Sequence, residues 1–437
     1  MSATRKPGYK LSTVGWIPAT WTVKSLSDVT TECKNRNNSK IDDKLLCGVL
    51  KNHGLVPMRE RVKGISTDRC KVVVPNAFAY NPMRLNIGSI ARNENQHAVM
   101  VSPDYVVFAV DPLQLLPNYL DQVRRSGLWE RYVGASGDGS VRIRIYYEHL
   151  ARLEFPIPPI PEQQKITAIL TNLDDKLNII GRQIKATHIL KRGMMQTLFS
   201  RGVGTLDVTT GHWMPHTEFK DSELGEIPAG WEVKALELIA DSITVGIATS
   251  TTEHYVEQGV PLIRNQNIKE DFLDMSDLLQ VSEEFDSKNK SKRVKEGDIL
   301  TVRTGYPGVS CVVPDGHGYL QTFTTLITRP NKKLISPHFV SRYFNSPKGK
   351  ELMLHQAAGG AQKNINAGNL KKLLVPVPSL VEQQKIAKIL AAVDAKIRSL
   401  ESKNRYYQTL KRGLIQKLLT GEWRVSLNTQ QEVAIAA

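Results

Sequence analysis

The segment PIPPIPEQQKITAILTNLDDKLNIIGRQIKATHILKRGMMQTLFSRG, residues 156–202, decides the fold because the chain contains it twice. Residues 376–422 read PVPSLVEQQKIAKILAAVDAKIRSLESKNRYYQTLKRGLIQKLLTGE and align with it without a gap, at an offset of 376 − 156 = 220 residues. Beyond the shared EQQKI, the identities between the copies include Lys191, Arg192, Gly193 and Gln196, which recur as Lys411, Arg412, Gly413 and Gln416. The chain is therefore a tandem repeat.

Both segments have the pattern of a long helix with one apolar stripe. Apolar residues recur at alternating steps of four and three: Ile166, Leu170, Leu173, Leu177, Ile180 and Ile184 in the first copy, and Ile386, Leu390, Val393, Ile397 and Leu400 in the second. This heptad stripe needs a second helix to cover it, and Pro161 and Pro378 stand where helices begin. Such a stripe alone is typical of a homodimeric coiled coil or a core helix. The tandem repeat favours pairing between the two copies within one chain.

A second repeat opens each half of the chain. STVGWIPATWTVKSL (12–26) matches SELGEIPAGWEVKAL (222–236), and the stretches between these openings and the helices are rich in short alternating strands punctuated by Gly and Pro. We predict an α+β fold with two strand-rich modules and two long helices that pair within the chain. The predicted parts are a first domain (1–155), a first helical region (156–205), a linker (206–221), a second domain (222–375), a second helical region (376–425) and a tail (426–437).

The composition favours an anionic partner. The 437 residues carry a formal net charge of +15, which is typical of proteins that bind nucleic acid. No apolar run approaches the length that crosses a bilayer, and the start MSATRKPGYK is not followed by the apolar core of a signal peptide, so we expect a cytoplasmic protein. Cys33, Cys47, Cys70 and Cys311 lie far apart without zinc-ligand spacing, which predicts reduced core thiols.

Three short motifs resemble catalytic or phosphate-binding sequences only in part. NPMR (81–84) lacks the second proline and the aromatic residue with which amino-methyltransferases hold a flipped base. GASGDGSVR (134–142) lacks the third glycine of a dinucleotide loop, and SPKGKE (346–351) lacks the Ser or Thr and the upstream glycine of a P-loop. We therefore predict no catalytic residue, no bound cofactor and no metal site in this chain.

Basic and amide side chains beside turns are better candidates, because Arg pairs with guanine and Asn or Gln with adenine in the major groove. In the first half these predicted DNA-binding residues are Asn81, Arg84, Asn86, Arg142, Arg144 and Tyr146; in the second they are Arg264, Asn265, Gln266, Asn267, Arg303, Thr304, Tyr306, Gln362, Lys363, Asn364 and Asn366. For partner-subunit contact or helix pairing we predict Glu162, Gln163, Gln164, Ile166, Leu170, Leu173, Leu177, Glu382, Gln383, Gln384, Ile386, Leu390, Val393 and Ile397.

The layout resembles the specificity subunit of type I restriction-modification enzymes over nearly the whole chain. The resemblance rests on GWIPATW and GEIPAGW, YNPMRLNIGSI, PLIRNQNI, GDILTVRTG and GGAQKNINAGNLKKLLVPVPSLVEQQKI, in the order that this family uses. It implies two target recognition domains, each reading one half of an asymmetric bipartite DNA site. It also implies that the two long helices form an antiparallel coiled coil, which sets the spacing and docks partners. The first half departs from the pattern, since it has VPNAFAYNPMR in place of a clear GDILTVRTG.

By the same resemblance, catalysis belongs to partners. Two methylation subunits would carry S-adenosylmethionine and modify adenine, and ATP- and Mg-dependent restriction subunits would translocate and cut double-stranded DNA. Two other hypotheses stay open from the sequence. A stand-alone methyltransferase would bind S-adenosylmethionine by itself, and a coiled-coil scaffold would bind DNA without regard to its sequence.

Overall fold

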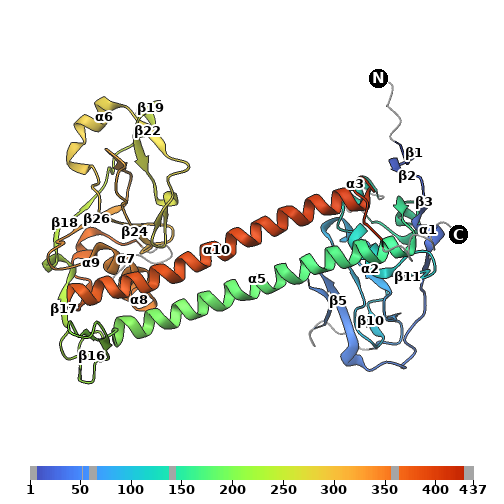
Figure 1. Cartoon of the computed structure of the whole chain (residues 1–437), viewed down its shortest axis with the longest axis horizontal. Helices are drawn as coiled ribbons and strands as arrows, with labels where there is room; N and C mark the ends of the chain where they lie inside the picture. The colour runs from blue at the N-terminus through green and yellow to red at the C-terminus, as the bar shows by residue number, and fades with distance from the viewer. Residues whose placement is uncertain (1–6, 52, 59–65, 137–143, 356–363, 428–437) are drawn as a thin grey trace. The chain divides into compact units, whose positions relative to one another are not determined.

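The computed structural model describes residues 7–51, 53–58, 66–136, 144–355 and 364–427. Its two longest helices are α5 (Ile160–Ser200) and α10 (Leu380–Leu419), where the sequence predicted them (Figure 1). At about 1.5 Å per residue, each is a rod of roughly 60 Å. The predicted mixture of helices and strands around two long helices is confirmed.

The first recognition module precedes α5 and contains two four-stranded sheets. One sheet has the order β4-β11-β8-β9 and is antiparallel; the other has the order β6-β5-β10-β7, with β10 parallel to β5. Their bounds are β4 (Thr30–Glu32), β5 (Leu46–Leu50), β6 (Gly54–Pro57), β7 (Lys71–Val73), β8 (Phe78–Tyr80), β9 (Ile90–Arg92), β10 (Val99–Val101) and β11 (Val106–Val110). The helices are α1 (Leu26–Val29), α2 (Pro117–Val123), α3 (Gly127–Ala135) and α4 (Tyr147–Leu150).

The second module lies between α5 and α10 in sequence and repeats this topology. Its sheet β18-β26-β23-β24 has the same antiparallel order, and β22-β19-β25 corresponds to β6-β5-β10 of the other sheet, with β19 parallel to β25. Their bounds are β18 (Ala240–Val245), β19 (Tyr255–Ile263), β22 (Leu279–Val281), β23 (Ile299–Thr301), β24 (Ser310–Val312), β25 (Gln321–Thr322) and β26 (Leu326–Pro330). Further elements are β20 (Ile268–Lys269), β21 (Phe272–Leu273), α6 (Glu283–Lys288), α7 (Pro337–Asn345), α8 (Pro347–His355) and α9 (Ala367–Lys371).

A two-stranded sheet connects the opening of each module to the entry of its helix. β3 (Thr22–Ser25) pairs with β12 (Glu154–Ile157), and β17 (Glu232–Ala235) pairs with β27 (Leu374–Val377). The openings are the hairpins β1 (Tyr9–Ser12)/β2 (Gly15–Pro18) and β15 (Phe219–Lys220)/β16 (Ile227–Pro228). A third hairpin, β13 (Thr205–Leu206)/β14 (Trp213–Met214), occupies the start of the predicted linker.

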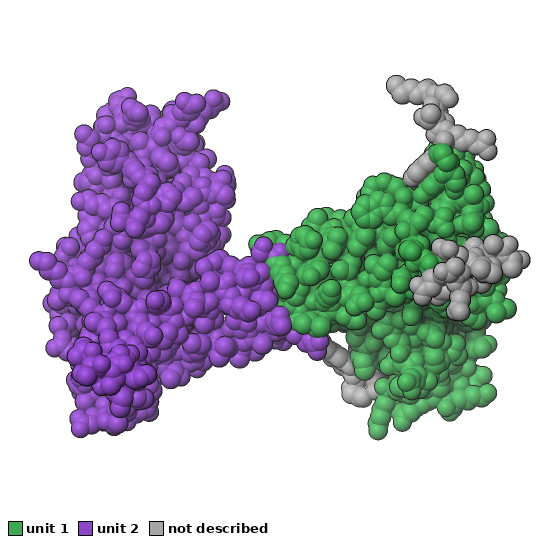
Figure 2. Space-filling view, viewed as in Figure 1, with its two compact units in different colours: residues 1–181, 403–437 green, residues 182–402 purple. Residues whose placement is uncertain are grey.

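The chain forms two compact units that do not follow the predicted domain boundaries. Unit 1 comprises residues 1–181 and 403–437, and unit 2 comprises residues 182–402 (Figure 2). Each unit therefore contains one module and one end of each long helix. The reason is packing: Ile166 and Leu170 of α5, with Ile415 and Leu418 of α10, belong to the hydrophobic core of the first module. The helix ends are core elements of the modules and not separate domains.

The core of unit 2 is built in the same way. Ile386 and Leu390 of α10 pack with Leu198 and Phe199 of α5 and with aromatic residues of α7. The thiols of Cys47, Cys70 and Cys311 are buried and unpaired, Cys33 is half-buried and unpaired, and burial raises the pKa of all four.

Candidate nucleic-acid interface

The three polar clusters predicted in the second half converge on one surface of unit 2. Arg303, directly after β23, donates from Nε to Asn364 Oδ1 at 3.1 Å, and Tyr306 OH donates to the carbonyl of Asn265 at 2.7 Å. Asn265 Nδ2 lies 3.4 Å from Thr304 Oγ1. Loops that are distant in sequence thus meet at the ends of β19 and β23.

This surface keeps hydrogen-bonding groups available. Gln266, Thr304 and Tyr306 are exposed, and Arg264, Arg303 and Asn364 are half-buried. Within the described part of the chain, Arg264 Nε and Asn265 Oδ1 are buried without a hydrogen-bond partner. Buried polar atoms are nearly always paired, so Arg264 Nε is a donor and Asn265 Oδ1 an acceptor whose hydrogen-bonding capacity is unused in this structure.

Two of the predicted contacts have structural roles. Asn267 is only 2% exposed, and its amide donates to the carbonyls of Asp274 and Asp277. Its side chain is therefore used inside the module, and its predicted contact with DNA stays a prediction. Asn366 is exposed, but its Oδ1 accepts the amide of Asn369 and caps α9.

The first module brings its predicted residues together in a corresponding place. Arg84 and Asn86 are exposed in the turn after β8, and Asn81 accepts the amide of Met83 at 3.0 Å. Arg144 and Tyr146 are exposed on the neighbouring segment. Arg142, Gln362 and Lys363 lie outside the described residues.

The structure supplies the missing counterpart of GDILTVRTG in the first half. In the first module Ile145 donates its amide to the Pro82 carbonyl at 3.0 Å, and in the second Ile365 donates to the Arg303 carbonyl at 3.2 Å. β8 and β23 occupy the same place in their sheets. The loop after β8, with Pro82 and Arg84, is therefore equivalent to the loop after β23, although the two sequences differ.

The predicted partner or helix-pairing residues divide into three groups. The stripe residues Ile166, Leu170, Leu173, Ile386, Leu390 and Ile397 are buried, Leu177 and Val393 are half-buried, and Gln164 and Gln384 are exposed. Glu162, Gln163, Glu382 and Gln383 are buried at 0–2% exposure and bind their own modules. The attachment of each helix to its own module by these four residues was not predicted from the sequence.

In each unit, the buried glutamate of EQQKI accepts several hydrogen bonds from different segments. Glu382 accepts hydrogen bonds from Trp231 Nε1 at 2.9 Å, from the amides of Val203 and Gly204 at 2.9 and 3.0 Å, and from His216. Glu162 accepts the indole of Trp21 at 3.1 Å and the guanidinium of Arg424. The repeated Trp that opens each module is thereby fixed to the repeated Glu that begins its helix.

The first glutamine of EQQKI has the same function beside it. Gln163 accepts the Leu116 amide at 2.8 Å, and Gln383 accepts the Ser336 amide at 2.7 Å. Both side-chain amides donate back to carbonyls of the segments they bind. The sequence signal that could have identified these roles was the recurrence of both residues: Trp21 and Trp231 in the repeated opening, and Glu162 and Glu382 in EQQKI.

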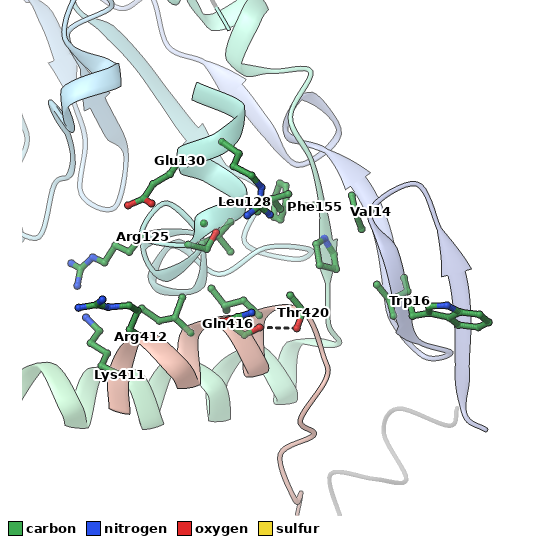
Figure 3. A pocket seen from close by; sticks show the side chains of 18 of the residues that line it. Val14, Trp16, Arg125, Leu128, Glu130, Phe155, Lys411, Arg412, Gln416 and Thr420 are labelled. Carbon is green, nitrogen blue, oxygen red and sulfur yellow. Dashed lines mark hydrogen bonds between the residues drawn. The ribbon is translucent and has the colours of Figure 1, made fainter. Parts of the chain in front are cut away.

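A cleft of about 790 Å³ lies inside unit 1, between α3, the end of α10 and the β1–β2 hairpin (Figure 3). Arg125, Lys411 and Arg412 lie at one end of it, and Val14 and Phe155 line the other. The cleft is therefore lined by charged side chains, Glu130 among them, at one end and by apolar side chains at the other. It is distinct from the loops after β8.

A family model described as "Type I restriction modification DNA specificity domain" matches residues 132–187 and 228–406, more than half of the chain. The chain belongs to this family. The match includes the EQQKI start and the larger part of both long helices, and the loops of the second module that meet at Arg303.

Members of the type I specificity family resemble the chain over its full length. The putative type I restriction enzyme MjaX specificity subunit of Methanocaldococcus jannaschii is 25% identical, over 96% of this chain and 98% of the relative. The type I restriction enzyme EcoKI specificity subunit of Escherichia coli K12 is 21% identical, over 95% and 91%.

Solved structures show the same fold. The type I restriction-modification S subunit from M. genitalium matches with a TM-score of 0.53 at 17% identity, over 97% of this chain and 100% of that one. A chain from a study of complex assembly and conformational transition of a type I R-M system matches with a TM-score of 0.55 at 16% identity, over 93% and 99%.

Among the described residues, no helix is long and apolar enough to cross a membrane, and no group of three or more His, Cys, Asp and Glu side chains could hold a metal ion. Within SPKGKE, Lys350 forms an ion pair with Glu270. Met83 and Arg84 of NPMR are exposed at the surface, and most of GASGDGSVR lies outside the described residues.

Proposed function

We propose that this chain is the DNA specificity subunit of a type I restriction-modification enzyme. Each module reads one half of an asymmetric bipartite site, and the helices set the distance between the halves. The observation that carries the proposal is a duplicated scaffold with divergent loops: β8 and β23 occupy equivalent positions, yet they lead into NPMR and VRTG. One scaffold with two loop sets suits a target with two different half-sites.

The surface loops have the chemistry for reading base edges. Arginine can donate two hydrogen bonds to guanine, and asparagine or glutamine can pair with adenine in the major groove. Arg303, Asn364 and Gln266 present these groups in unit 2, and Arg84, Asn86 and Arg144 present them in unit 1. The formal net charge of +15 favours the phosphate backbone and predicts an affinity that falls steeply with salt.

We infer a surface for partner subunits from residues that are repeated without an internal reason. Gly193 and Gly413 occupy equivalent positions in α5 and α10, are exposed, and have no heavy atom within 4 Å of the place where a Cβ would stand. A glycine inside a helix costs about 0.5–1 kcal/mol relative to alanine. The chain itself does not require glycine at these two positions, because a Cβ would meet no neighbour. The close approach of another protein to the helix explains why both glycines are present.

The neighbours of these glycines extend that surface. Arg192 and Gln196 are exposed in unit 2, and their counterparts Arg412 and Gln416 are exposed in unit 1, where both line the cleft. Two matching surfaces suit two copies of one partner, which we assign to methylation subunits. The partners would bring S-adenosylmethionine, and restriction subunits would bring the ATP- and Mg-dependent activity; this chain supplies no catalytic group in the proposal.

The test is to co-express the chain with the products of its neighbouring genes and to map methylated adenines in the host DNA. A split motif with a fixed nonspecific spacer is expected. Methylation by the isolated chain with S-adenosylmethionine would instead favour a stand-alone methyltransferase. Equal affinity for scrambled duplexes, with no motif from a stable complex, would favour a scaffold that binds DNA nonspecifically.

A further inference from the structure

Unit 2 contains a buried network of four charged side chains that joins its module to both long helices. Asp394 of α10 accepts Lys191 of α5 at 2.7 Å and Arg342 of α7. Arg342 also lies 3.6 Å from Asp271, in the turn between β20 and β21. The side chains are 6–11% exposed. We call Asp271, Arg342, Asp394 and Lys191 the second charge network.

Unit 1 contains a network of the same design. Asp174 of α5 forms an ion pair with Lys411 of α10. It forms a second ion pair, at 3.0 Å, with Arg125, which follows α2. Arg125 in turn lies 3.2 Å from Asp121 of α2. We call Asp121, Arg125, Asp174 and Lys411 the first charge network. Asp174 and Arg125 are 26% and 36% exposed, so the first charge network is more exposed to solvent than the second.

The two networks obey the repeat. Asp174 and Asp394 are 220 residues apart, and so are Lys191 and Lys411. Along α5 the pairs advance from 174 to 191, whereas along α10 their partners go back from 411 to 394, which is the order of an antiparallel pair. In each unit the aspartate comes from the helix that follows the module, the lysine from the other helix, and the arginine from the module.

The apolar stripes do not fix this register by themselves. Ile and Leu recur at every heptad, and a slip of one heptad would place one apolar residue where another stood. Such a slip is about 10 Å along the helix at 1.5 Å per residue, or roughly three base pairs at 3.4 Å per base pair. Buried ion pairs contribute little net stability, but a wrong register leaves their charges unpaired, and this penalty specifies one register.

We propose that Asp174 and Asp394 are positioning residues that determine the length of the spacer between the two half-sites. Each carboxylate binds the arginine of a module and the lysine of the opposite helix. One side chain therefore fixes both the position of the module on its helix and the register between the two helices. This inference rests on the proposed function. It concerns the distance between the half-sites and not their base sequences.

The experiment measures methylation by the intact complex on a series of DNA duplexes with the native half-sites and with spacers that range from about three base pairs shorter to about three base pairs longer than the native length. For the Asp394→Asn variant we expect the preference for the native spacer to fall about tenfold, the scale of one lost hydrogen bond to a charged group. The half-site sequences should stay unchanged. Unchanged spacer discrimination in Asp394→Asn and Asp174→Asn would overturn the inference.

Matched variants separate positioning from loss of structure. Asp175→Asn makes the same change at the exposed neighbour of Asp174 and should leave discrimination unaltered. If Asp394→Asn does not fold, Lys191→Gln removes only the link between the helices and Arg342→Gln only the link to the module. Either variant should lower the preference for the native spacer length. A lower methylation rate at every spacer length, with the preference unchanged, would contradict the inference. A wild-type complex without any split motif would refute the proposed function itself.

Discussion

Trp231 and Glu382 are joined by a hydrogen bond of 2.9 Å although 151 residues separate them, and Trp21 and Glu162 form the equivalent bond. The indole opens a module, and the carboxylate begins the helix that follows it. In unit 2 the same carboxylate holds the amides that follow α5. One buried side chain therefore connects the opening of the module, the end of one helix and the start of the other.

Replacing Glu382 by Gln should destabilise unit 2. The neutral amide accepts hydrogen bonds more weakly and places an NH₂ group among donors, which we expect to cost about 2 kcal/mol or more. Hydrogen exchange measured by mass spectrometry should show the amides of Val203 and Gly204 losing protection first. Gln384→Ala, at an exposed position two residues along α10, is the control and should leave their exchange rates unchanged.

Replacing Arg303 by Ala should weaken recognition of one half-site only. Losing a bidentate contact to a base costs about 1–3 kcal/mol of discrimination at that position. Competition binding of the assembled complex, with single substitutions across both half-sites, measures the effect. Lys333→Ala removes an exposed charge from the same module and should alter no base preference. Reduced discrimination in both half-sites would argue against modular recognition.

Alanine at Gly193 and Gly413 should have opposite effects on the chain and on its complex. In the isolated chain each change should stabilise the helix by about 0.5–1 kcal/mol, because no internal neighbour opposes a Cβ. Association with the methylation subunit, measured by titration calorimetry, should become weaker. Gly181→Ala is the matched control, since Gly181 is also exposed in α5 but Glu401 stands at its repeat position. Undiminished association of the double variant would exclude the glycines from the interface.

The second charge network predicts a specific acid sensitivity. Burial alone would raise the pKa of Asp394, but hydrogen bonds from Arg342 and Lys191 outweigh burial, so the pKa lies below its ordinary value of 3.8. A depressed pKa means that the unfolded chain binds more protons in acid. The stabilisation by Asp394 is therefore present above about pH 4 and lost as the pH falls through the folded pKa.

Hydrogen exchange of α7 and α10 across this pH range should show a smaller acid-induced loss of protection in Asp394→Asn than in the wild type. Asp271 acts in the opposite direction, since burial raises its pKa against the opposing charge of Arg342. Asp271→Asn should therefore not diminish the acid sensitivity. Glu253→Gln, at an exposed position of unit 2, provides the baseline. Equal acid sensitivity of Asp394→Asn and wild type would contradict the assignment.

The sequence predicted the internal repeat and the two long helices. The 220-residue offset and the heptad stripes located α5 and α10 to within a few residues, because helical periodicity is a local signal. The sequence could not predict that Asp394 meets Lys191 and Arg342, or that Glu382 meets Trp231, since such pairs depend on how distant segments pack. The domain boundaries differed for the same reason: the ends of α5 and α10 are parts of the module cores.

Within the candidate interface, residue type predicted the loops better than the individual contacts. The clusters around Arg264, Arg303 and Asn364 do meet in unit 2. Asn267 was indistinguishable from its neighbours in sequence, yet its amide satisfies two backbone carbonyls in the interior. Composition identifies polar loops, but burial decides which of their side chains reach a ligand.

The hydrogen bonds from Ile145 to Pro82 and from Ile365 to Arg303 join main-chain atoms only. No side chain of the loop after β8 or of the loop after β23 takes part in this bond, and loops as unlike as NPMR and VRTG occupy the same place. Substitutions in these loops can therefore accumulate without disturbing the sheet beneath. A lineage of such proteins can acquire new target sequences while its framework and its partners stay as they were.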